Sequence, residues 1–221
     1  MRKVSFCDGE IYHIYNRGVE KRDIFADQAD LKRFIESVNL FNDIELAGSF
    51  YEQSLLTKQN KIRKPEKLVE IICFALNPNH FHFLLKQTKE KGIEKFMHRL
   101  GVGYSLYFNK KHKRSGHLFQ GVFKSKHVDS NEYLLDLSAY VNLNDKIHHL
   151  NNEISQLSLT SWSQFAELKA RKSPIKVCGE IIMEQFKNSK EYEKFAEDKL
   201  PDFWENKNFR KELEILEAEE K

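Results

Sequence analysis

Two apolar runs in the middle of the chain, residues 68–76 and 81–86, are separated only by Asn77-Pro78-Asn79. Asn and Pro are strong turn formers, so this segment predicts two adjacent strands of an antiparallel hairpin. The rest of the fold can be assembled around this hairpin.

The elements around the hairpin follow from the spacing of apolar and turn-forming residues. Residues 10–17 are rich in β-branched and aromatic side chains and predict a first strand, with a fourth strand expected over residues 118–127. Helical spacing predicts helices over residues 27–46, 92–109 and 131–143. The candidate N-caps are Asp27 or Asp30 for the first of these helices, and Ser130 or Asp129 for the last.

The resulting order, β-α-β-β-α-β-α, is that of an α+β ferredoxin-like sandwich with an antiparallel sheet. We expect the helices on one face of that sheet and an open face free for a ligand. Residues 1–150 would form this domain, with an irregular, basic surface insertion at about residues 48–67. Residues 151–221 would form a charged helical C-terminal extension, in which residues 157–165 could pack back on the core.

The positive charge of the chain is concentrated in one segment. Residues 95–128 contain eight Lys and Arg and no Asp or Glu, so with a formal net charge of +3 the remainder carries −5. The same segment contains aromatic residues on which unpaired bases could stack, namely Phe96, Tyr104, Tyr107, Phe108, Phe119 and Phe123. It predicts single-stranded nucleic acid as a partner. A solvated helix face with core aromatics is the alternative.

Cys7, Cys73 and Cys178 form no C-x-x-C pair and are odd in number, which favours a reducing cytoplasm over a disulfide framework. No stretch approaches the ~20 apolar residues that span a bilayer, and the N-terminus lacks the apolar core of a signal peptide. We therefore expect a cytoplasmic protein that is not associated with membranes.

His80-Phe81-His82 lies in the second strand of the hairpin, where alternation places both imidazoles on one face and Phe81 on the other. Two imidazoles on a rigid strand can hold a divalent ion and leave positions open for phosphate oxygen or water. The motif is weak alone, since strand histidines are more often simply half-buried. Tyr140 and Asn144 lie one turn apart on the last predicted helix, although packing is the usual role of a Tyr at the margin of an apolar stripe.

Several strings together resemble the single-tyrosine HUH transposases of bacterial insertion sequences, and especially the transposases associated with repetitive extragenic palindromes (REP). They occur in collinear order over about two thirds of the chain: Tyr12-His13-Ile14-Tyr15-Asn16-Arg17-Gly18, Arg22-Asp23-Ile24-Phe25, Asn77-Pro78-Asn79-His80-Phe81-His82-Phe83-Leu84-Leu85, Tyr107-Phe108-Asn109, Gly116-His117-Leu118-Phe119-Gln120-Gly121-Val122-Phe123-Lys124, and Tyr133-Leu134-Leu135 through Tyr140-Val141-Asn142-Leu143-Asn144. A collinear set of this kind is far more specific than any one motif.

The resemblance implies metal-dependent cleavage and strand transfer of single-stranded DNA, folded as an imperfect hairpin, and association with the bacterial nucleoid. Tyr140 matches the nucleophile, which forms a 5′-phosphotyrosine and leaves a free 3′-hydroxyl. His80 and His82 match the ligands of Mg²⁺ or Mn²⁺, and Asn144 stands where the superfamily places a third ligand. His13 is expected behind these ligands or against the substrate, with an ordinary half-buried strand histidine as the alternative. The residues expected to contact DNA are Arg17, Lys110, Lys111, Lys113, Arg114, Lys124 and Lys126.

Other functions remain compatible with the same residues. A relative that recognises chromosomal palindromes without transposing would keep His80, His82 and Tyr140. An RNA-recognition-like module would need aromatics on the open sheet face, whereas Phe81 and Phe83 are opposite in phase to the histidines. A ribonuclease or a plain metal hydrolase would leave no covalent DNA adduct. The sequence also leaves open whether the tyrosine acts within one chain or is exchanged in a homodimer.

Overall fold

A computed structural model describes residues 5–45, 66–148, 156–166 and 173–205 of the chain. Its centre is a five-stranded antiparallel sheet in the order β4-β1-β3-β2-β5. The strands are β1 (Ile11–Arg17), β2 (Val69–Asn77), β3 (His80–Gln87), β4 (Lys124–His127) and β5 (Leu159–Thr160). The first four follow the predicted ferredoxin-like topology, and the hairpin turns at Pro78 and Asn79. β5 adds a short edge strand beside β2.

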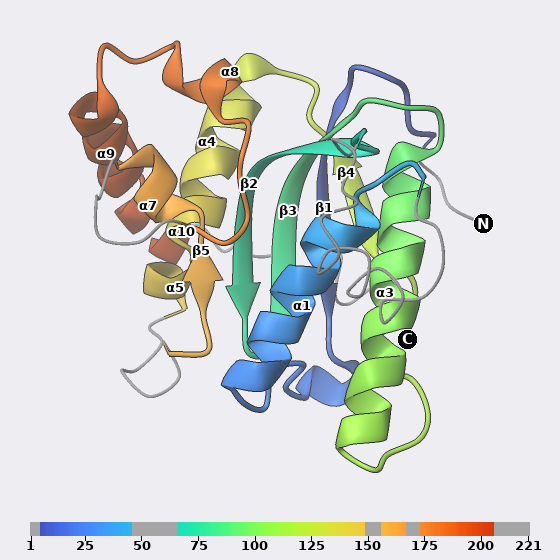
Figure 1. The fold of residues 1–221 in the computed structure, drawn as a ribbon. Helices are drawn as coiled ribbons and strands as arrows, with labels where there is room; N and C mark the ends of the chain where they lie inside the picture. The colour runs from blue at the N-terminus through green and yellow to red at the C-terminus, as the bar shows by residue number, and fades with distance from the viewer. Residues whose placement is uncertain (1–4, 46–65, 149–155, 167–172, 206–221) are drawn as a thin grey trace.

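Two helices cover one face of the sheet, in front of it in Figure 1: α1 (Gln28–Phe41) and α3 (Gly92–Lys111). Their apolar sides meet Ile14, Phe81 and Phe83 in the larger hydrophobic core. Asp27 is the N-cap of α1, and its side chain accepts from the backbone N–H of Asp30 at 2.9 Å. α1 ends at Phe41, earlier than predicted. The predicted insertion falls largely on residues 46–65, outside the described part of the chain.

The opposite face of the sheet is not open, which corrects the expectation from the sequence. Helix α4 (Asn131–Asn142) packs on β2 and β3, and the short helices after it pack on α4 or on one another at the left of Figure 1. These are α5 (Asn144–Ile147), α7 (Trp162–Phe165), α8 (Glu180–Met183), α9 (Ser189–Asp198) and α10 (Leu200–Glu205). A second hydrophobic core forms between these helices and the sheet. It buries the apolar stripe of α4 and the apolar side chains of the C-terminal helices, which would otherwise be exposed to water.

The fourth strand is shorter than predicted. Only Lys124–His127 pairs with β1, whereas residues 118–123 form a loop in which Phe119 makes an isolated bridge with Gly18, the residue after β1. Gly121 has a φ of 69°, a left-handed conformation that interrupts a strand. Leu118 and Phe119 are buried in the larger core, so their apolar character reflects packing of a loop.

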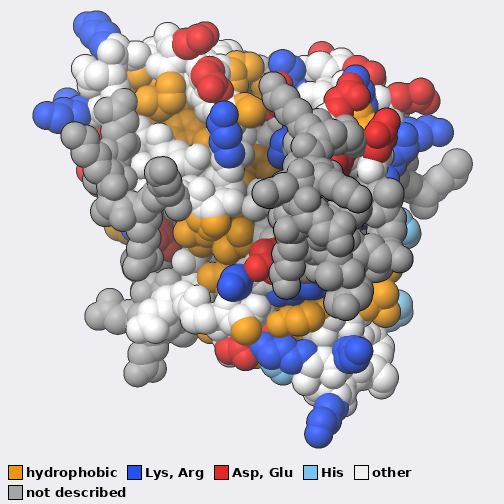
Figure 2. Space-filling view, in the orientation of Figure 1, with side chains coloured by type: hydrophobic (Ala, Val, Ile, Leu, Met, Phe, Trp, Pro, Cys, Tyr) orange, Lys and Arg blue, Asp and Glu red, His pale blue; other side chains and the backbone are white. Residues whose placement is uncertain are grey.

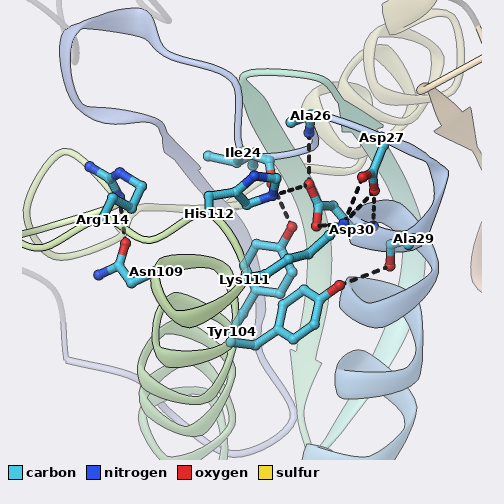
Figure 3. Close-up of polar contacts among 11 residues, drawn as sticks. Ile24, Ala26, Asp27, Ala29, Asp30, Tyr104, Asn109, Lys111, His112 and Arg114 are labelled. Atoms are coloured by element: carbon cyan, nitrogen blue, oxygen red, sulfur yellow. Dashed lines mark hydrogen bonds and ion pairs between the residues drawn. The ribbon is translucent and has the colours of Figure 1, made fainter.

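The end of α3 is tied to the start of α1 by a polar cluster around the buried carboxylate of Asp30 (Figure 3). Lys111 Nζ lies 2.7 Å from Asp30 Oδ1, and His112 Nε2 lies 2.9 Å from Asp30 Oδ2. Tyr104 donates from its hydroxyl to the Ile24 carbonyl at 2.5 Å. The cluster fixes the basic loop after α3 beside the turn of the hairpin, because the Pro78 carbonyl accepts from the backbone N–H of Ile24 at 2.6 Å.

The aromatic residues of the basic segment are mostly core residues. Phe96, Tyr104, Phe108 and Phe119 are buried in the larger cluster, and Tyr107 and Phe123 pack against it. Base stacking on the four buried rings is therefore excluded, and the alternative of core aromatics holds for them. Phe81 and Phe83 are buried in the same core, so these two rings are not available for base stacking on the other face.

Candidate active site

One face of the sheet collects the polar residues that the sequence singled out. In the antiparallel register Arg17 pairs with His80, and Tyr15 pairs with His82, so these four side chains share a face. His13 is two residues before Tyr15 and faces the same way. This is the face on which α4 packs. His80 and His82 therefore lie on one face of the strand and Phe81 on the other, as alternation predicted.

The side chain of His80 is held at both ring nitrogens by asparagines. Nδ1 lies 2.6 Å from Asn79 Oδ1, so this nitrogen carries the hydrogen and donates it. Nε2 then carries a lone pair. It lies 2.9 Å from Asn77 Nδ2 and 3.3 Å from Asn144 Oδ1.

His82 is held by His13. His13 Nε2 lies 2.9 Å from His82 Nδ1, and the two rings are stacked with centroids 5.1 Å apart. The ring of His80 stands edge-on to that of His82 at 5.2 Å. If His82 binds a cation through Nε2, its Nδ1 must carry the hydrogen and donate it to His13.

Burial keeps these histidines uncharged at neutral pH. Burial lowers the pKa of His13 to about 3, with a smaller effect of Lys126. Burial, followed by the nearby His148, lowers the pKa of His80 to about 3. Burial also holds the pKa of His82 well below its usual value, with His13 contributing next. Neutral imidazoles are the form that binds metal ions.

Tyr140 comes to the same place from α4. Its side chain is 4% exposed, and its ring stands edge-on to that of His82 with centroids 5.8 Å apart. Phe203 of α10 also packs edge-on against Tyr140, with ring centroids 5.6 Å apart. The tyrosine that the sequence placed at the margin of an apolar stripe is therefore buried between the histidines and the C-terminal helices.

Asn144 lies at the site, but in a different helix from the one predicted. α4 ends at Asn142, and after Leu143 (φ −103°, ψ 17°) Asn144 begins the separate helix α5, so Tyr140 and Asn144 do not share one helix. Asn144 is nevertheless buried, and its Oδ1 lies 2.5 Å from Asn77 Nδ2 as well as near His80. The structure thus brings together His80, His82, Tyr140 and Asn144.

The chemistry of these side chains fits a divalent cation. Imidazole nitrogens and an amide oxygen are suitable ligands for Mn²⁺ and related ions. Asn77 Oδ1, an acceptor, is buried beside these ligands without a hydrogen-bond partner among the described residues, and such an unpaired oxygen is suited to a cation. In the described part of the chain, no three His, Cys, Asp or Glu side chains could hold a metal together. The third protein ligand would therefore be an amide oxygen.

The basic residues fall into two groups. Lys124 and Lys126 pair with Tyr15 and His13 across β1 and β4, so they lie on the histidine face together with Arg17. Arg17 also donates to Gln120 Oε1 at 3.2 Å.

The second group follows the end of α3 and comprises Lys110, Lys111, Lys113 and Arg114. Figure 2 shows Lys and Arg side chains at this lower end of the molecule. Lys111 is engaged with Asp27 and Asp30. Although burial opposes its charge, these two hydrogen-bonded carboxylates raise its pKa. Arg114 donates to Asn109 Oδ1 at 2.6 Å (Figure 3).

Three site residues were not predicted from the sequence: Asn77, Asn79 and His148. Asn77 precedes the hairpin turn and Asn79 lies in it. Because asparagine is common in turns, the sequence pattern offered no reason to assign either residue a further role. The exposed ring of His148 lies 5.0 Å from that of His80. Its position four residues after Asn144 was the signal that could have identified it.

A groove of about 950 Å³ lies elsewhere, between the outer side of α3 and the loop at residues 116–123. Val102, Leu106 and Val122 are exposed along it. Phe81 lines the groove, and Phe81 points away from the histidine face. The sheet therefore separates this groove from the candidate site.

The profile of the family described as "Transposase IS200 like" matches residues 11–144. The chain belongs to the IS200-like transposase family. The match contains every residue of the site from His13 to Asn144. One similar solved structure is a REP-associated tyrosine transposase bound to a REP hairpin; it is 10% identical, with a TM-score of 0.47 over 81% of this chain and 92% of that chain. No curated protein sequence gives a significant match.

The part of this IS200-like family member that the structure describes contains no helix long and apolar enough to cross a membrane.

Proposed function

We propose that this protein cleaves and rejoins single-stranded DNA, with Tyr140 as the nucleophile. The observation that carries the proposal is the meeting of Tyr140 with His80, His82 and Asn144 on one face of the sheet. Membership of the IS200-like transposase family supports a DNA substrate and a strand-transfer reaction.

In the proposed reaction the Tyr140 oxygen attacks a backbone phosphorus, and the bond from phosphorus to the 3′ oxygen breaks. The phenol loses one proton and the departing 3′ oxygen gains one. One phosphodiester bond replaces another, so the 5′-phosphotyrosine retains a bond that can be used for rejoining. The free 3′-hydroxyl of a second strand can reverse the step. His80, His82 and Asn144 would hold Mg²⁺ or Mn²⁺, which when bound supplies stabilisation of charge on the phosphate oxygens.

The remaining residues would position the ligands and the DNA. His13 would orient His82 through the 2.9 Å contact between their nitrogens. Arg17, Lys124 and Lys126 share the histidine face and would contact phosphates there. Lys110, Lys113 and Arg114 would extend this contact at the end of α3, whereas Lys111 has its charge engaged by Asp27 and Asp30. A DNA hairpin is the proposed partner because it presents single strands beside a duplex.

The proposal is tested by incubating the protein with labelled hairpin oligonucleotides taken from the DNA that flanks its gene. Mn²⁺ or Mg²⁺ is compared with chelator, and products are separated on a denaturing gel. We expect a metal-dependent covalent protein–DNA species with the native protein and with Tyr133→Phe, and none with Tyr140→Phe or His80→Ala. Tight binding without any adduct would instead indicate a DNA-binding relative that does not cleave, and cleavage without an adduct would indicate a hydrolase.

A further inference from the structure

Asn77 is fully buried at the end of β2, directly across the hairpin from His80. Its amide nitrogen lies 2.9 Å from His80 Nε2 and 2.5 Å from Asn144 Oδ1. Both of these atoms accept hydrogen bonds, and they lie only 3.3 Å apart. The two hydrogens of one NH₂ group can satisfy both acceptors at once.

The orientation of the acceptors is set from outside this triangle. Asn79 Oδ1 fixes the hydrogen of His80 on Nδ1, so the lone pair of Nε2 points at Asn77 and Asn144. Asn79 is oriented in turn by its Nδ2, which donates to the Lys21 carbonyl at 3.4 Å. Two lone pairs thus converge on one point. In the absence of a cation, only a donor between them makes that arrangement favourable.

The other end of the Asn77 amide has no such partner. Asn77 Oδ1 is buried without a hydrogen-bond partner among the described residues. A carboxamide that turns over by half a rotation exchanges its oxygen and nitrogen with almost no change in shape. Oδ1 would then join His80 Nε2 and Asn144 Oδ1, and three lone pairs would face one point. That arrangement is repulsive when empty and attractive around a cation.

We propose that Asn77 is an additional oxygen ligand of the divalent cation, and that its amide turns over when the ion binds. In the metal-free protein the two hydrogens of its NH₂ group bridge the two acceptors and hold the ligands together. The separations fit this role, because ligand atoms at right angles around an ion at about 2.1 Å lie about 3 Å apart. The inference rests on the metal site of the proposed function and adds a residue to it.

The test measures Mn²⁺ binding without DNA, by electron paramagnetic resonance of free Mn²⁺, and thermal unfolding with and without Mn²⁺. The variants are Asn77→Ala and Asn77→Asp. We expect Asn77→Ala to weaken Mn²⁺ binding at least about tenfold. The carboxylate of Asn77→Asp presents an oxygen in both orientations, but it has no hydrogens to donate to His80 Nε2 and Asn144 Oδ1. It should therefore lower the Tm of the metal-free protein and bind Mn²⁺ at least as tightly as the native protein, so that Mn²⁺ raises its Tm by more.

The control is Asn42→Asp, the same exchange at a buried asparagine at the other end of β2, where both side-chain atoms bond to the backbone of Val69. It should lower the Tm and leave Mn²⁺ affinity unchanged. If Asn77 only bridges its neighbours, Asn77→Asp will weaken Mn²⁺ binding as Asn77→Ala does, and the proposal is overturned. Native affinity in Asn77→Ala overturns it too. Failure of the native protein to bind Mn²⁺ would remove the metal site itself, a separate outcome.

Discussion

At the residue scale, hydrogen-bond direction decides which nitrogen of each histidine is left for a cation. Asn79 takes the hydrogen of His80 Nδ1, and His13 can take that of His82 Nδ1, so each Nε2 is available. This arrangement leaves His13 with its own hydrogen on Nδ1, which has no partner among the described residues. Burying such a donor is unfavourable. A role of His13 in orienting His82 as a metal ligand would explain why this unpaired donor is retained.

Replacing His13 tests that role. His13→Phe removes the acceptor for His82 Nδ1–H, and we expect a loss of roughly tenfold or more in Mn²⁺ affinity, typical of residues that orient a metal ligand. His13→Gln keeps a hydrogen-bonding side chain and should recover part of the loss. His98→Phe, at an exposed histidine of α3, is the control. Equal Mn²⁺ affinities for His13→Phe and the native protein, measured by calorimetry, would show that His13 does not orient His82.

At the scale of elements, the position of Tyr140 depends on how α4 is held. Tyr192 of α9 is buried, and its hydroxyl lies 2.8 Å from Asn142 Nδ2 and 3.1 Å from Ser138 Oγ. Ser161 donates to Asn142 Oδ1 at 2.5 Å and accepts from the backbone N–H of Phe74 in β2. The C-terminal region is therefore bonded to both α4 and the sheet.

Removal of the Tyr192 hydroxyl should loosen this attachment. Tyr192→Phe leaves the buried amide nitrogen of Asn142 without its partner, which predicts a loss of about 1–3 kcal/mol in the free energy of unfolding. Ser138 keeps the bond from its hydroxyl to the Leu135 carbonyl. Urea denaturation followed by circular dichroism measures it. Tyr107→Phe is the matched control, because the hydrogen bond of the Tyr107 hydroxyl with the Ala29 carbonyl is exposed and 3.5 Å long, and the variant should change stability by less than about 0.5 kcal/mol. Similar losses for both variants would contradict the proposed attachment.

Strands and helices with strong periodicity could be predicted from the sequence, and interactions between distant residues could not. The hairpin, the phase of His80 and Phe81, and the N-caps Asp27 and Ser130 follow from local rules and agree with the structure. The loop at residues 118–123 was misread because its buried apolar side chains resemble a strand. The role suggested for Asn77 depends on contact with Asn144, 67 residues later, which no local pattern contains.

At the scale of the whole molecule, the sheet is covered on both faces, and its histidine face is polar toward one end and apolar under α4. Cys73, Ala75 and Leu84 lie in the second core, whereas Arg17, His80 and Asn77 lie at the end where the hairpin turns. The basic loop after α3 is fixed at that same end by Asp30. DNA in the proposed complex would approach from this end.

The buried histidines predict a stability that depends on pH. An unfolded histidine has a pKa of ~6.5, whereas those of His13 and His80 are lowered to about 3 by burial. Below pH ~6.5 the unfolded chain binds protons that the folded chain excludes, so stability is highest above that pH and falls as the pH drops toward 3. By pH 5 the loss is up to about 2 kcal/mol per histidine.

Urea unfolding of the metal-free protein at pH 7.5 and pH 5 measures this loss. His13→Gln should have a smaller difference between the two pH values, and His98→Gln, at an exposed site, should match the native protein. A difference unchanged in His13→Gln would mean that His13 is not held uncharged in the fold. Asp27, whose pKa is lowered mainly by its hydrogen bond with Lys111, contributes at lower pH, below ~4.

The central claim is that Tyr140 becomes joined to a 5′-phosphate of DNA, and peptide mapping of the covalent complex tests it most directly. Trypsin releases residues 127–146 as one peptide that contains both Tyr133 and Tyr140. After nuclease trimming, fragmentation in a mass spectrometer can place the nucleotide on one of them. The account predicts a nucleotide 5′-phosphate on Tyr140. A nucleotide on Tyr133 or on any other residue, or cleaved DNA with no modified peptide, would contradict it.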